Sequence, residues 1–225
     1  MSHRLPRSFY FRPTLQVARE LLGQLIVRNY RGKRLVGRIV EVEAYRGSID
    51  PASHAYRGKT KRNEVMFWEG GHLYVYFTYG MHFCANVVTQ REGIAEAVLI
   101  RGVEPVHGIG VMRALRGKKT ADVNLTNGPA KFCEAFGIGR KENGLSLLGK
   151  EVYLEAGIRI PQTRIGKSAR IGIRTGTDKN WRFFVKGNPW VLKKQSRQRT
   201  SPLRRRRQSD GRKKREVQLI PALTA

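Results

Sequence analysis

The run Tyr74–Val88, YVYFTYGMHFCANVV, constrains the fold more than any other stretch of the chain. Two segments rich in aromatic and β-branched residues flank the dipeptide Tyr79-Gly80, as in two antiparallel strands joined by a tight turn. The sequence therefore predicts a β-hairpin here. It also puts a large aromatic ring, that of Tyr79, at the exposed end of the hairpin, where burial cannot stabilise it.

The segments before this hairpin indicate one helix and two strands. Pro13 at the first turn and Gly23 at the end bracket a helix with an apolar face, which we expect to pack on a sheet. Residues 24–30 and 35–45 have the composition of strands and are separated by the turn Arg31-Gly32-Lys33.

The segments after the hairpin indicate further strands and two helices. An apolar run from Ala95 to Ile100 predicts a strand that ends at Arg101. Helices are expected to start after Pro105 and after Gly128-Pro129. Later strands of the same sheet are expected at residues 151–155, 170–174 and 181–186.

An irregular segment, residues 47–63, lies between the second strand and the hairpin. It is rich in Gly, Pro, Ser and Lys and shows no periodicity. Long loops of this kind inside folded domains are more often functional than idle, so the segment is a candidate for a site. His54 lies within it, although a loop histidine taken alone is more often an ordinary surface residue.

Charge indicates the class of partner. The chain holds 44 Lys and Arg residues and 17 Asp and Glu residues, a formal net charge of +27, and a polyanion is the obvious partner. Residues 193–225 hold 12 basic and 2 acidic residues, a net +10, which leaves +17 on residues 1–192. Such a surface attracts the phosphates of DNA or RNA, although ribosomal proteins and proteins on anionic membranes share this property.

We expect one folded domain, residues 1–192, followed by a basic tail, residues 193–225. The tail contains KKQSRQRTSPLRRRRQSDGRKKRE, which has too few apolar residues to fold by itself, so we predict that it is disordered. It either adds non-specific affinity for nucleic acid or has no such role, and the sequence leaves both possibilities open.

We expect the protein to stay inside the cell. No apolar run approaches 18 residues, so no membrane span is expected, and the start, MSHRLPRSFYFRPTL, lacks the apolar centre of a signal peptide. Cys84 and Cys133 lack the spacing of a zinc site or a disulfide framework, and we expect both to be buried and reduced.

The segment Arg38–Tyr45, RIVEVEAY, holds the most suggestive pair of acids. Period-two alternation puts Glu41, Glu43 and Tyr45 on one strand face, with the Cα atoms of the two acids roughly 6.5 Å apart. One carboxylate could then act as a base while the other is structural, and such a pair also suits work at a glycosidic bond. The pattern alone favours a plainer interpretation, a solvated strand face with alternating glutamates.

Other patterns argue against several chemistries. The chain lacks a P-loop, a dinucleotide-binding fingerprint and a nucleophile elbow, which disfavours phosphoryl, hydride and acyl transfer. His82 and Cys84 share one strand face, but two potential ligands without a third make a weak metal site.

Seven runs of the chain form a more specific pattern: FRPTLQVARELLGQLIVR, VEVEAYRGSIDPASHAYRG, RNEVMF, LYVYFTYGMHFCANVV, LIRGVEP, NGPAKFCEAFGI and RFFVKGNPWV. Together, and in this order, they resemble the alkyladenine (3-methyladenine) DNA glycosylase family over nearly all of residues 11–191. The resemblance implies a single-domain α+β fold with a curved, mainly antiparallel β-sheet flanked by helices. It also implies that neither a metal nor an organic cofactor is needed.

The activity that the resemblance implies is hydrolysis of the N-glycosidic bond of a damaged purine in double-stranded DNA. The expected lesions are 3-methyladenine, 7-methylguanine, hypoxanthine and ethenoadenine, and the product is an abasic site. A monomer is expected, located inside the cell with DNA, which in a bacterium means the cytoplasm and nucleoid.

By resemblance, the protruding hairpin inserts Tyr79 into the minor groove. The ring would fill the gap left when a nucleotide swings out of the duplex, which offsets part of the few kcal/mol that this extraction costs. Met81 and His82 follow the turn and are expected to touch the groove as well.

The EAY motif corresponds to Glu43 and Tyr45. By resemblance, Glu43 is the general base that activates a water for attack on C1′, and Glu41 is structural. Tyr45 and His54 are expected to sandwich the base, with Tyr76 against the opposite face. The backbone N–H of His54 is expected to hydrogen-bond the base edge.

Two further residues correspond to family positions. Asn86 matches the residue that excludes guanine by crowding its amino group, and Arg101 matches the arginine that holds the water and a phosphate. No pocket lysine is implied, so no imine intermediate and no strand cleavage are expected. Ala130 and Phe132 depart from the smaller residue and the leucine expected in the family's helix start, which concerns packing rather than chemistry.

Two other functions remain open at this point. One is a non-catalytic nucleic-acid-binding protein with the same fold and basic surface. The other is a hydrolase of ribonucleosides or RNA that uses Glu43 in the same way.

Overall fold

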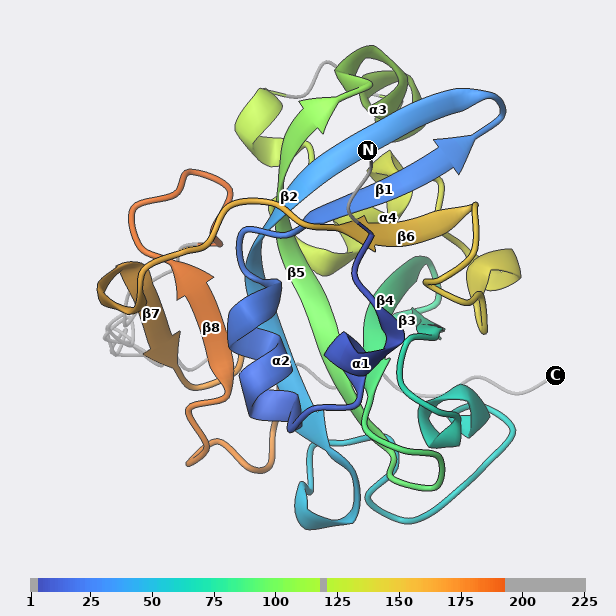
Figure 1. The fold of residues 1–225 in the computed structure, drawn as a ribbon, viewed down its shortest axis with the longest axis vertical. Helices are drawn as coiled ribbons and strands as arrows, with labels where there is room; N and C mark the ends of the chain where they lie inside the picture. The colour runs from blue at the N-terminus through green and yellow to red at the C-terminus, as the bar shows by residue number, and fades with distance from the viewer. Residues whose placement is uncertain (1–3, 118–120, 193–225) are drawn as a thin grey trace, which may run out of the picture. The chain divides into compact units, whose positions relative to one another are not determined.

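The computed structural model describes residues 4–117 and 121–192 (Figure 1). They belong to one unit of the chain, Met1–Lys193. The tail predicted for residues 193–225 lies outside the described residues, so neither its disorder nor its role is addressed by the structure.

The described residues form a mixed α+β fold around one sheet, and every pairing in that sheet is antiparallel, as predicted. Its strands are β1 (Leu25–Tyr30), β2 (Lys33–Arg46), β3 (Leu73–Thr78), β4 (His82–Thr89), β5 (Glu96–His107), β6 (Val152–Glu155), β7 (Ile165–Ser168) and β8 (Arg182–Val185). The α-helices are α1 (Arg7–Tyr10), α2 (Thr14–Leu21), α3 (Ile109–Arg116) and α4 (Pro129–Ala135), and short 3-10 helices include η1 (Gly47–Ile49), η2 (Glu64–Phe67) and η4 (Arg140–Glu142).

The long strand β2 organises the sheet, whose main path is β3-β4-β5-β2-β1-β6. β5 follows β2 along its length, β1 pairs with its first half, and β8 pairs with Glu41–Glu43 in its second half. Figure 1 shows β2 and β5 running together through the centre of the sheet. Residues 41–43 are therefore enclosed by a strand on each side.

The helix predicted between Pro13 and Gly23 is α2, which packs on β2 and β5. Val17, Ala18 and Leu21 fall on one helical face and are fully buried in the main core. Phe132 of α4 and Phe136, directly after this helix, enter the same core with their ring centroids 4.9 Å apart, so the larger residue at 132 is accommodated by packing. The predicted burial of both cysteines is confirmed.

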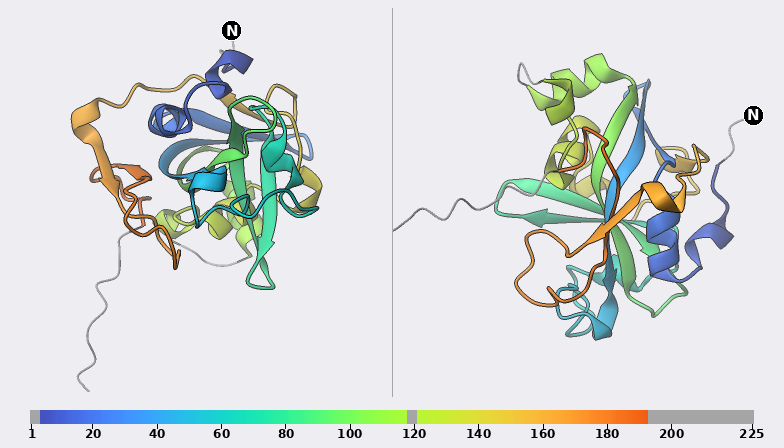
Figure 2. Two further views of the ribbon diagram at one scale, coloured as in Figure 1. Left: turned by 90° about the horizontal axis from the view of Figure 1, so that it is seen from below. Right: turned by 90° about the vertical axis from the view of Figure 1, so that its left-hand side faces the viewer.

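The predicted hairpin is formed by β3 and β4, and Figure 2 shows it extending beyond the neighbouring strands. At the turn, Tyr79 and Gly80 have φ angles of 51° and 68°, and the N–H of Met81 donates to the carbonyl oxygen of Thr78. Two successive positive φ angles match the twist of a tight hairpin. Tyr79 is 82% exposed, so the ring does stand at the tip.

The irregular segment 47–63 is fixed to the sheet by a second apolar cluster. Ala55, together with Val65 and Met66 of η2, packs on Tyr74 and Val88 of the hairpin. The buried side chain of Asn63 also donates to the carbonyl oxygens of His54 and Gly58 at 2.8 and 2.9 Å. The segment is therefore irregular but anchored, as a site-bearing loop must be.

The predictions for residues 95–105 were wrong about where β5 ends. The strand continues through Arg101, which lies inside it, and through Pro105 to His107, so the next helix, α3, starts only at Ile109. Proline is tolerated because the register with β2 shifts at Val36–Gly37, opposite Pro105, and such irregularities accept a residue without an N–H.

The strand predicted at residues 170–174 is absent from the described part of the chain, and β7 lies earlier, at Ile165–Ser168. Gly172 has a φ of 79°, which a strand does not use. Ile171 and Ile173, within the segment predicted as a strand, instead line a cavity.

Gly102 of β5 provides a test of how tightly this region is packed. A Cβ atom there would lie 2.7 Å from the carbonyl oxygen of Trp190 and 3.0 Å from Cβ of Glu41. We expect Gly102→Ala to lower the free energy of unfolding by about 1–3 kcal/mol, measured by urea denaturation. The control is Gly110→Ala in α3, where nothing lies within 4 Å of the added atom and alanine favours the helix. Equal changes in the free energy of unfolding of the two variants would contradict the close packing around Gly102.

Candidate active site

The pairing register of four neighbouring strands places one row of side chains side by side. Glu43 of β2 pairs with Leu99 of β5, Leu99 pairs with Asn86 of β4, and Asn86 pairs with Tyr74 of β3. Residues directly opposite in an antiparallel sheet share a face. Tyr45 and Tyr76, two positions along their strands, lie on that same face.

A cavity of about 520 Å³ lies over this face, a size typical of pockets for small molecules. Its sheet side includes Tyr45, Tyr76, Asn86, Leu99 and Arg101. Two irregular segments complete it, residues 51–54 from the loop after β2 and residues 171–175 from the loop before β8. The cavity is therefore built between the predicted site-bearing loop and a second loop that the sequence did not indicate.

Glu43 lies directly behind the cavity surface, with none of its area exposed. The backbone N–H of Ile171 donates to its Oε1 at 2.7 Å, and the Tyr45 hydroxyl donates to its Oε2 at 2.9 Å. Nη1 of Arg101 lies 3.3 Å from the same Oε2. All three partners line the cavity, so the carboxylate is one contact away from its surface.

Burial raises the pKa of Glu43 above its ordinary value, even though Arg101, the Ile171 N–H and Tyr45 favour the charged form. The carboxylate is thus a stronger base than a solvated one. Burial also raises the pKa of Tyr45 well above its ordinary value, so its hydroxyl remains a donor to Glu43.

Glu41 is buried as completely as Glu43, so the solvated strand face suggested by the pattern alone is wrong. Oε1 of Glu41 accepts from Nε of Arg101 at 3.1 Å and from Nε of Arg182 at 2.7 Å. Its Oε2 accepts from the backbone N–H of Leu192 at 2.8 Å. Two acids and two arginines therefore balance one another, as buried charges must.

Arg101 reaches both acids because of two irregularities in the pairing of β2 with β5. The register passes from Ile39↔Val103 to Glu41↔Gly102 and then to Val42↔Ile100, which leaves Arg101 without an opposite partner residue. Such bulges redirect a side chain. No feature of the local sequence indicates them.

The aromatic residues of the cavity form a cluster. The rings of His54 and Tyr76 meet edge-on with centroids 4.5 Å apart, Tyr74 stacks on Tyr76, and Nδ1 of His54 lies 3.0 Å from the Tyr74 hydroxyl. The expected arrangement had Tyr76 on the face of the base opposite to His54. Because the rings of these two residues are in edge contact, no purine fits between them. Burial, followed by the charge of Arg62, lowers the pKa of His54 to about 4, so the imidazole is neutral at pH 7.

Of the remaining predicted residues, Asn86 and Tyr79 line the cavity, whereas Met81 and His82 do not. Asn86 is buried, lines the cavity and donates to the carbonyl oxygen of Tyr74 at 3.1 Å. Tyr79 reaches the cavity from the hairpin tip. Met81, 70% exposed, and His82 lie beside it on the tip and face solvent.

Sequence reasoning missed Asp50, Arg170 and Ile171. Asp50 and Arg170 form a fully buried ion pair, and Ile171 binds Glu43. They are 120 residues or more from their partners in the chain, so no local pattern could reveal the contacts. An aspartate before proline in the irregular segment was the one available signal.

No group of three or more His, Cys, Asp or Glu side chains within residues 4–117 and 121–192 is arranged to hold a metal ion. None of the helices in this described part has the length and apolar character needed to cross a bilayer.

Comparison with known proteins gives consistent matches. Residues 8–189 match the family model described as "Methylpurine-DNA glycosylase (MPG)". A protein of Carboxydothermus hydrogenoformans is 53% identical over 191 residues, 84% of this chain and 99% of its own length. A protein of Chlorobaculum tepidum is 48% identical, with 85% of this chain and 92% of its own length covered. Each is named "Putative 3-methyladenine DNA glycosylase".

The raised pKa of Glu43 predicts a dependence of stability on pH. The folded state holds the Glu43 proton more tightly than the unfolded state, so the wild type loses stability as pH rises from the ordinary carboxyl value through the raised one. Glu43→Gln lacks this loss. We expect it to melt at higher temperature than the wild type at pH 8, by about 2–4 °C for each kcal/mol gained.

The difference in melting temperature should shrink as pH falls toward the ordinary carboxyl value, where the wild type recovers its proton. Thermal denaturation of both proteins across this pH range measures it. A difference that stays constant, or that grows on acidification, would show that burial does not penalise the Glu43 charge.

Proposed function

The chain belongs to the methylpurine-DNA glycosylase family, and from this premise we propose that it draws a damaged purine nucleotide into the cavity and cleaves its N-glycosidic bond with a water activated by Glu43. Family membership makes it a hydrolase of N-glycosyl bonds, a DNA-3-methyladenine glycosylase that acts on damaged DNA in base excision repair. A non-catalytic binding protein is thereby set aside. The observation that carries the mechanism is the buried Glu43 carboxylate, held by three residues of the cavity wall.

Glu43 acts as the general base. When a water is placed between its carboxylate and C1′ of the nucleotide, Glu43 takes a proton from the water and the oxygen bonds to C1′. The bond from C1′ to the base nitrogen breaks and its electron pair goes to the purine, so a cationic alkylated purine leaves as a neutral base, whereas hypoxanthine or ethenoadenine leaves neutral only after it has been protonated. The negative charge also favours the positive charge that develops on the sugar. Arg101, which contacts both Glu43 and Glu41, orients the carboxylate and offers a cation to the nucleotide's phosphate.

The aromatic side chains hold the base. We assign Tyr45 to one face of the purine and the His54–Tyr76 pair to the other, because the latter two rings are already in contact. Stacking is worth roughly 1–3 kcal/mol per base and tolerates different bases, which suits 3-methyladenine, 7-methylguanine, hypoxanthine and ethenoadenine alike. A neutral His54 does not repel the cationic members of this set, and Asn86 crowds the amino group of guanine.

The hairpin opens the duplex. Tyr79 stands exposed at the tip and also borders the cavity, so its ring can occupy the gap beside the nucleotide that enters. Met81 and His82 then contact the minor groove. The folded domain, residues 1–192, acts as a monomer, and the basic tail, residues 193–225, adds salt-sensitive affinity for the backbone.

The product is an abasic site in an intact strand. No lysine lines the cavity among the residues that the structure describes, so no amine is available there to form an imine with the sugar. Strand cleavage therefore needs a separate step, such as treatment with alkali.

Glu43→Gln tests the catalytic assignment. We expect it to bind a duplex with ethenoadenine or hypoxanthine as the wild type does, but to form abasic sites at least about 100-fold more slowly, the scale of general-base catalysis. A gel after alkali treatment measures abasic sites, and the same gel without alkali reports any nicking.

The matched control is Glu142→Gln, which changes a buried, arginine-paired glutamate outside the cavity and should keep its activity. Equal excision by the wild type and Glu43→Gln would refute the role of Glu43. Faster release of bases from a ribose substrate than from damaged DNA would favour the hydrolase of ribonucleosides or RNA.

Tyr79→Ala tests the role of the hairpin. We expect excision to slow by about 10-fold or more for a well-paired lesion, because extraction then costs most, and to slow less for a lesion opposite a gap. Tyr79→Phe retains the ring and should act nearly as the wild type. Single-turnover excision on the two duplexes measures the effect, and an equal loss on both would argue against insertion.

A further inference from the structure

We propose that Asp50 and Arg170 are positioning residues for this reaction, a buried pair that holds the two loop walls of the cavity at a fixed spacing and aims the Glu43 carboxylate. The inference rests on the proposed function of Glu43. It concerns two residues that contact neither the substrate's bond nor the water, and that act through Ile171, Tyr45 and the loops.

The Asp50–Arg170 pair is fully buried and joined by two hydrogen bonds. The two Nη atoms of Arg170 donate to the two carboxylate oxygens of Asp50 at 2.5 and 2.7 Å, and neither side chain has any exposed area. A planar guanidinium matched to both oxygens fixes orientation as well as distance.

Asp50 fixes the first loop wall through hydrogen bonds to its backbone. Its oxygens also accept from the backbone N–H groups of Arg46 and Ala52, each at 3.2 Å. These bonds lock the loop immediately before residues 51–54, the part that lines the cavity and ends in His54. A displacement of Asp50 therefore moves the aromatic wall.

Arg170 holds the second loop wall and the two residues that donate hydrogen bonds to Glu43. It donates to the carbonyl oxygen of Ala44 at 3.0 Å, and its guanidinium lies 4.6 Å from the centre of the Tyr45 ring. The next residue, Ile171, gives its N–H to Glu43, and residues 171–175 line the cavity. Arg170 thus adjoins both hydrogen-bond donors to Glu43.

Fold stability does not require a pair of this kind. Replacing a buried ion pair by apolar residues is often neutral or stabilising, so such a pair is weak evidence of a role in stability alone. Space here is also restricted, because a Cβ atom on Gly176 would lie 3.1 Å from Arg170 and 3.3 Å from Asp50. A role in holding the two cavity walls and Glu43 in position therefore explains this pair better than a role in stability alone.

Arg170→Lys is the principal test, since it keeps the charge but loses the planar fork and the stacking on Tyr45. We expect duplex binding within about 2-fold of wild type and single-turnover excision slower by about 10- to 100-fold, because small misplacements of a catalytic group are costly. Asp50→Glu, which keeps the charge but displaces the carboxylate by one methylene, should act in the same direction and provides the test if Arg170→Lys does not fold.

A pH profile distinguishes positioning from general destabilisation. The Ile171 N–H favours the charged form of Glu43, so loosening it raises the pKa of Glu43 and moves the acidic limb of the excision rate to higher pH. The charged and titratable groups that influence Glu43 or pair across from it are Glu41, Tyr45, Tyr76, Cys84, Arg101, Arg170 and Arg182. Both variants leave the others in place.

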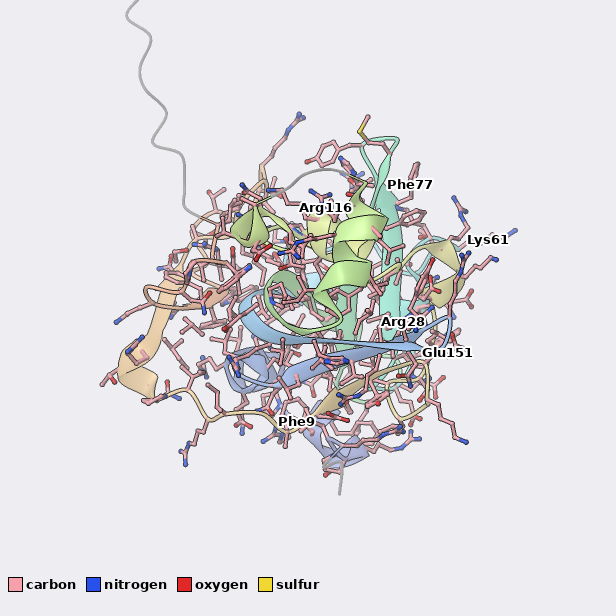
Figure 3. All side chains as sticks on the ribbon, turned by 90° about the horizontal axis from the view of Figure 1, so that it is seen from above. Phe9, Arg28, Lys61, Phe77, Arg116 and Glu151 are labelled. Atoms are coloured by element: carbon pink, nitrogen blue, oxygen red, sulfur yellow. The ribbon has the colours of Figure 1, made fainter. Side chains whose placement is uncertain are left out.

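The substrate is a duplex with one 7-methylguanine, whose fixed positive charge removes protonation of the base from the profile. The control is Arg28→Lys, the same change at a buried arginine bonded to Glu142 and Glu151. Figure 3 shows Arg28 beside Glu151 and well away from Phe77 of the hairpin. Arg28→Lys should lower stability without moving the limb.

Slower excision with the acidic limb moved to higher pH in Arg170→Lys or Asp50→Glu, and an unshifted limb in Arg28→Lys, would support the inference. A wild-type rate and limb in the folded cavity variants would overturn it, as would a slower rate with an unshifted limb. Either result would leave the role of Glu43 intact. A wild type that forms no abasic sites would instead refute the proposed function itself.

Discussion

The buried charges on β2 are the constraint on which the rest of the structure depends. Glu41 and Glu43 lie on one strand face with no exposure, and two negative charges there require compensation. Arg101 and Arg182 provide it from the strands on either side. The paired strands β5 and β8, the bulge at Arg101 and the backbone at Leu192 all serve this one network, which leaves Glu43 free to be the acid nearest the cavity.

The two acids have different surroundings, and the proposed function gives them different roles. Glu41 binds two arginines and a backbone N–H, so its charge is fully balanced. Glu43 has one arginine, a phenol and one N–H, and burial still raises its pKa. A carboxylate that is costly to bury is also a ready proton acceptor, so in the proposed mechanism the feature that weakens the fold is the one that the reaction uses. Neighbouring identical side chains thereby acquire different roles from their surroundings.

Much of this arrangement was predictable from local patterns. The hairpin with Tyr79 at its tip, helix α2 and the common face of Glu41 and Glu43 follow from composition and periodicity, which are local properties. The burial of that face, the bulge that redirects Arg101 and the Asp50–Arg170 pair depend on contacts between distant segments. For the same reason the sequence predicted a strand at residues 170–174, where the chain forms a cavity wall.

The most direct test is a crystal structure of Glu43→Gln bound to a duplex that carries one ethenoadenine. The account predicts the modified base inside the cavity, between Tyr45 and the His54–Tyr76 pair, with C1′ facing residue 43 and the Tyr79 ring in the vacated position of the duplex. A base still stacked in the helix, or a duplex bound on another face with residue 43 distant from any sugar, would contradict it.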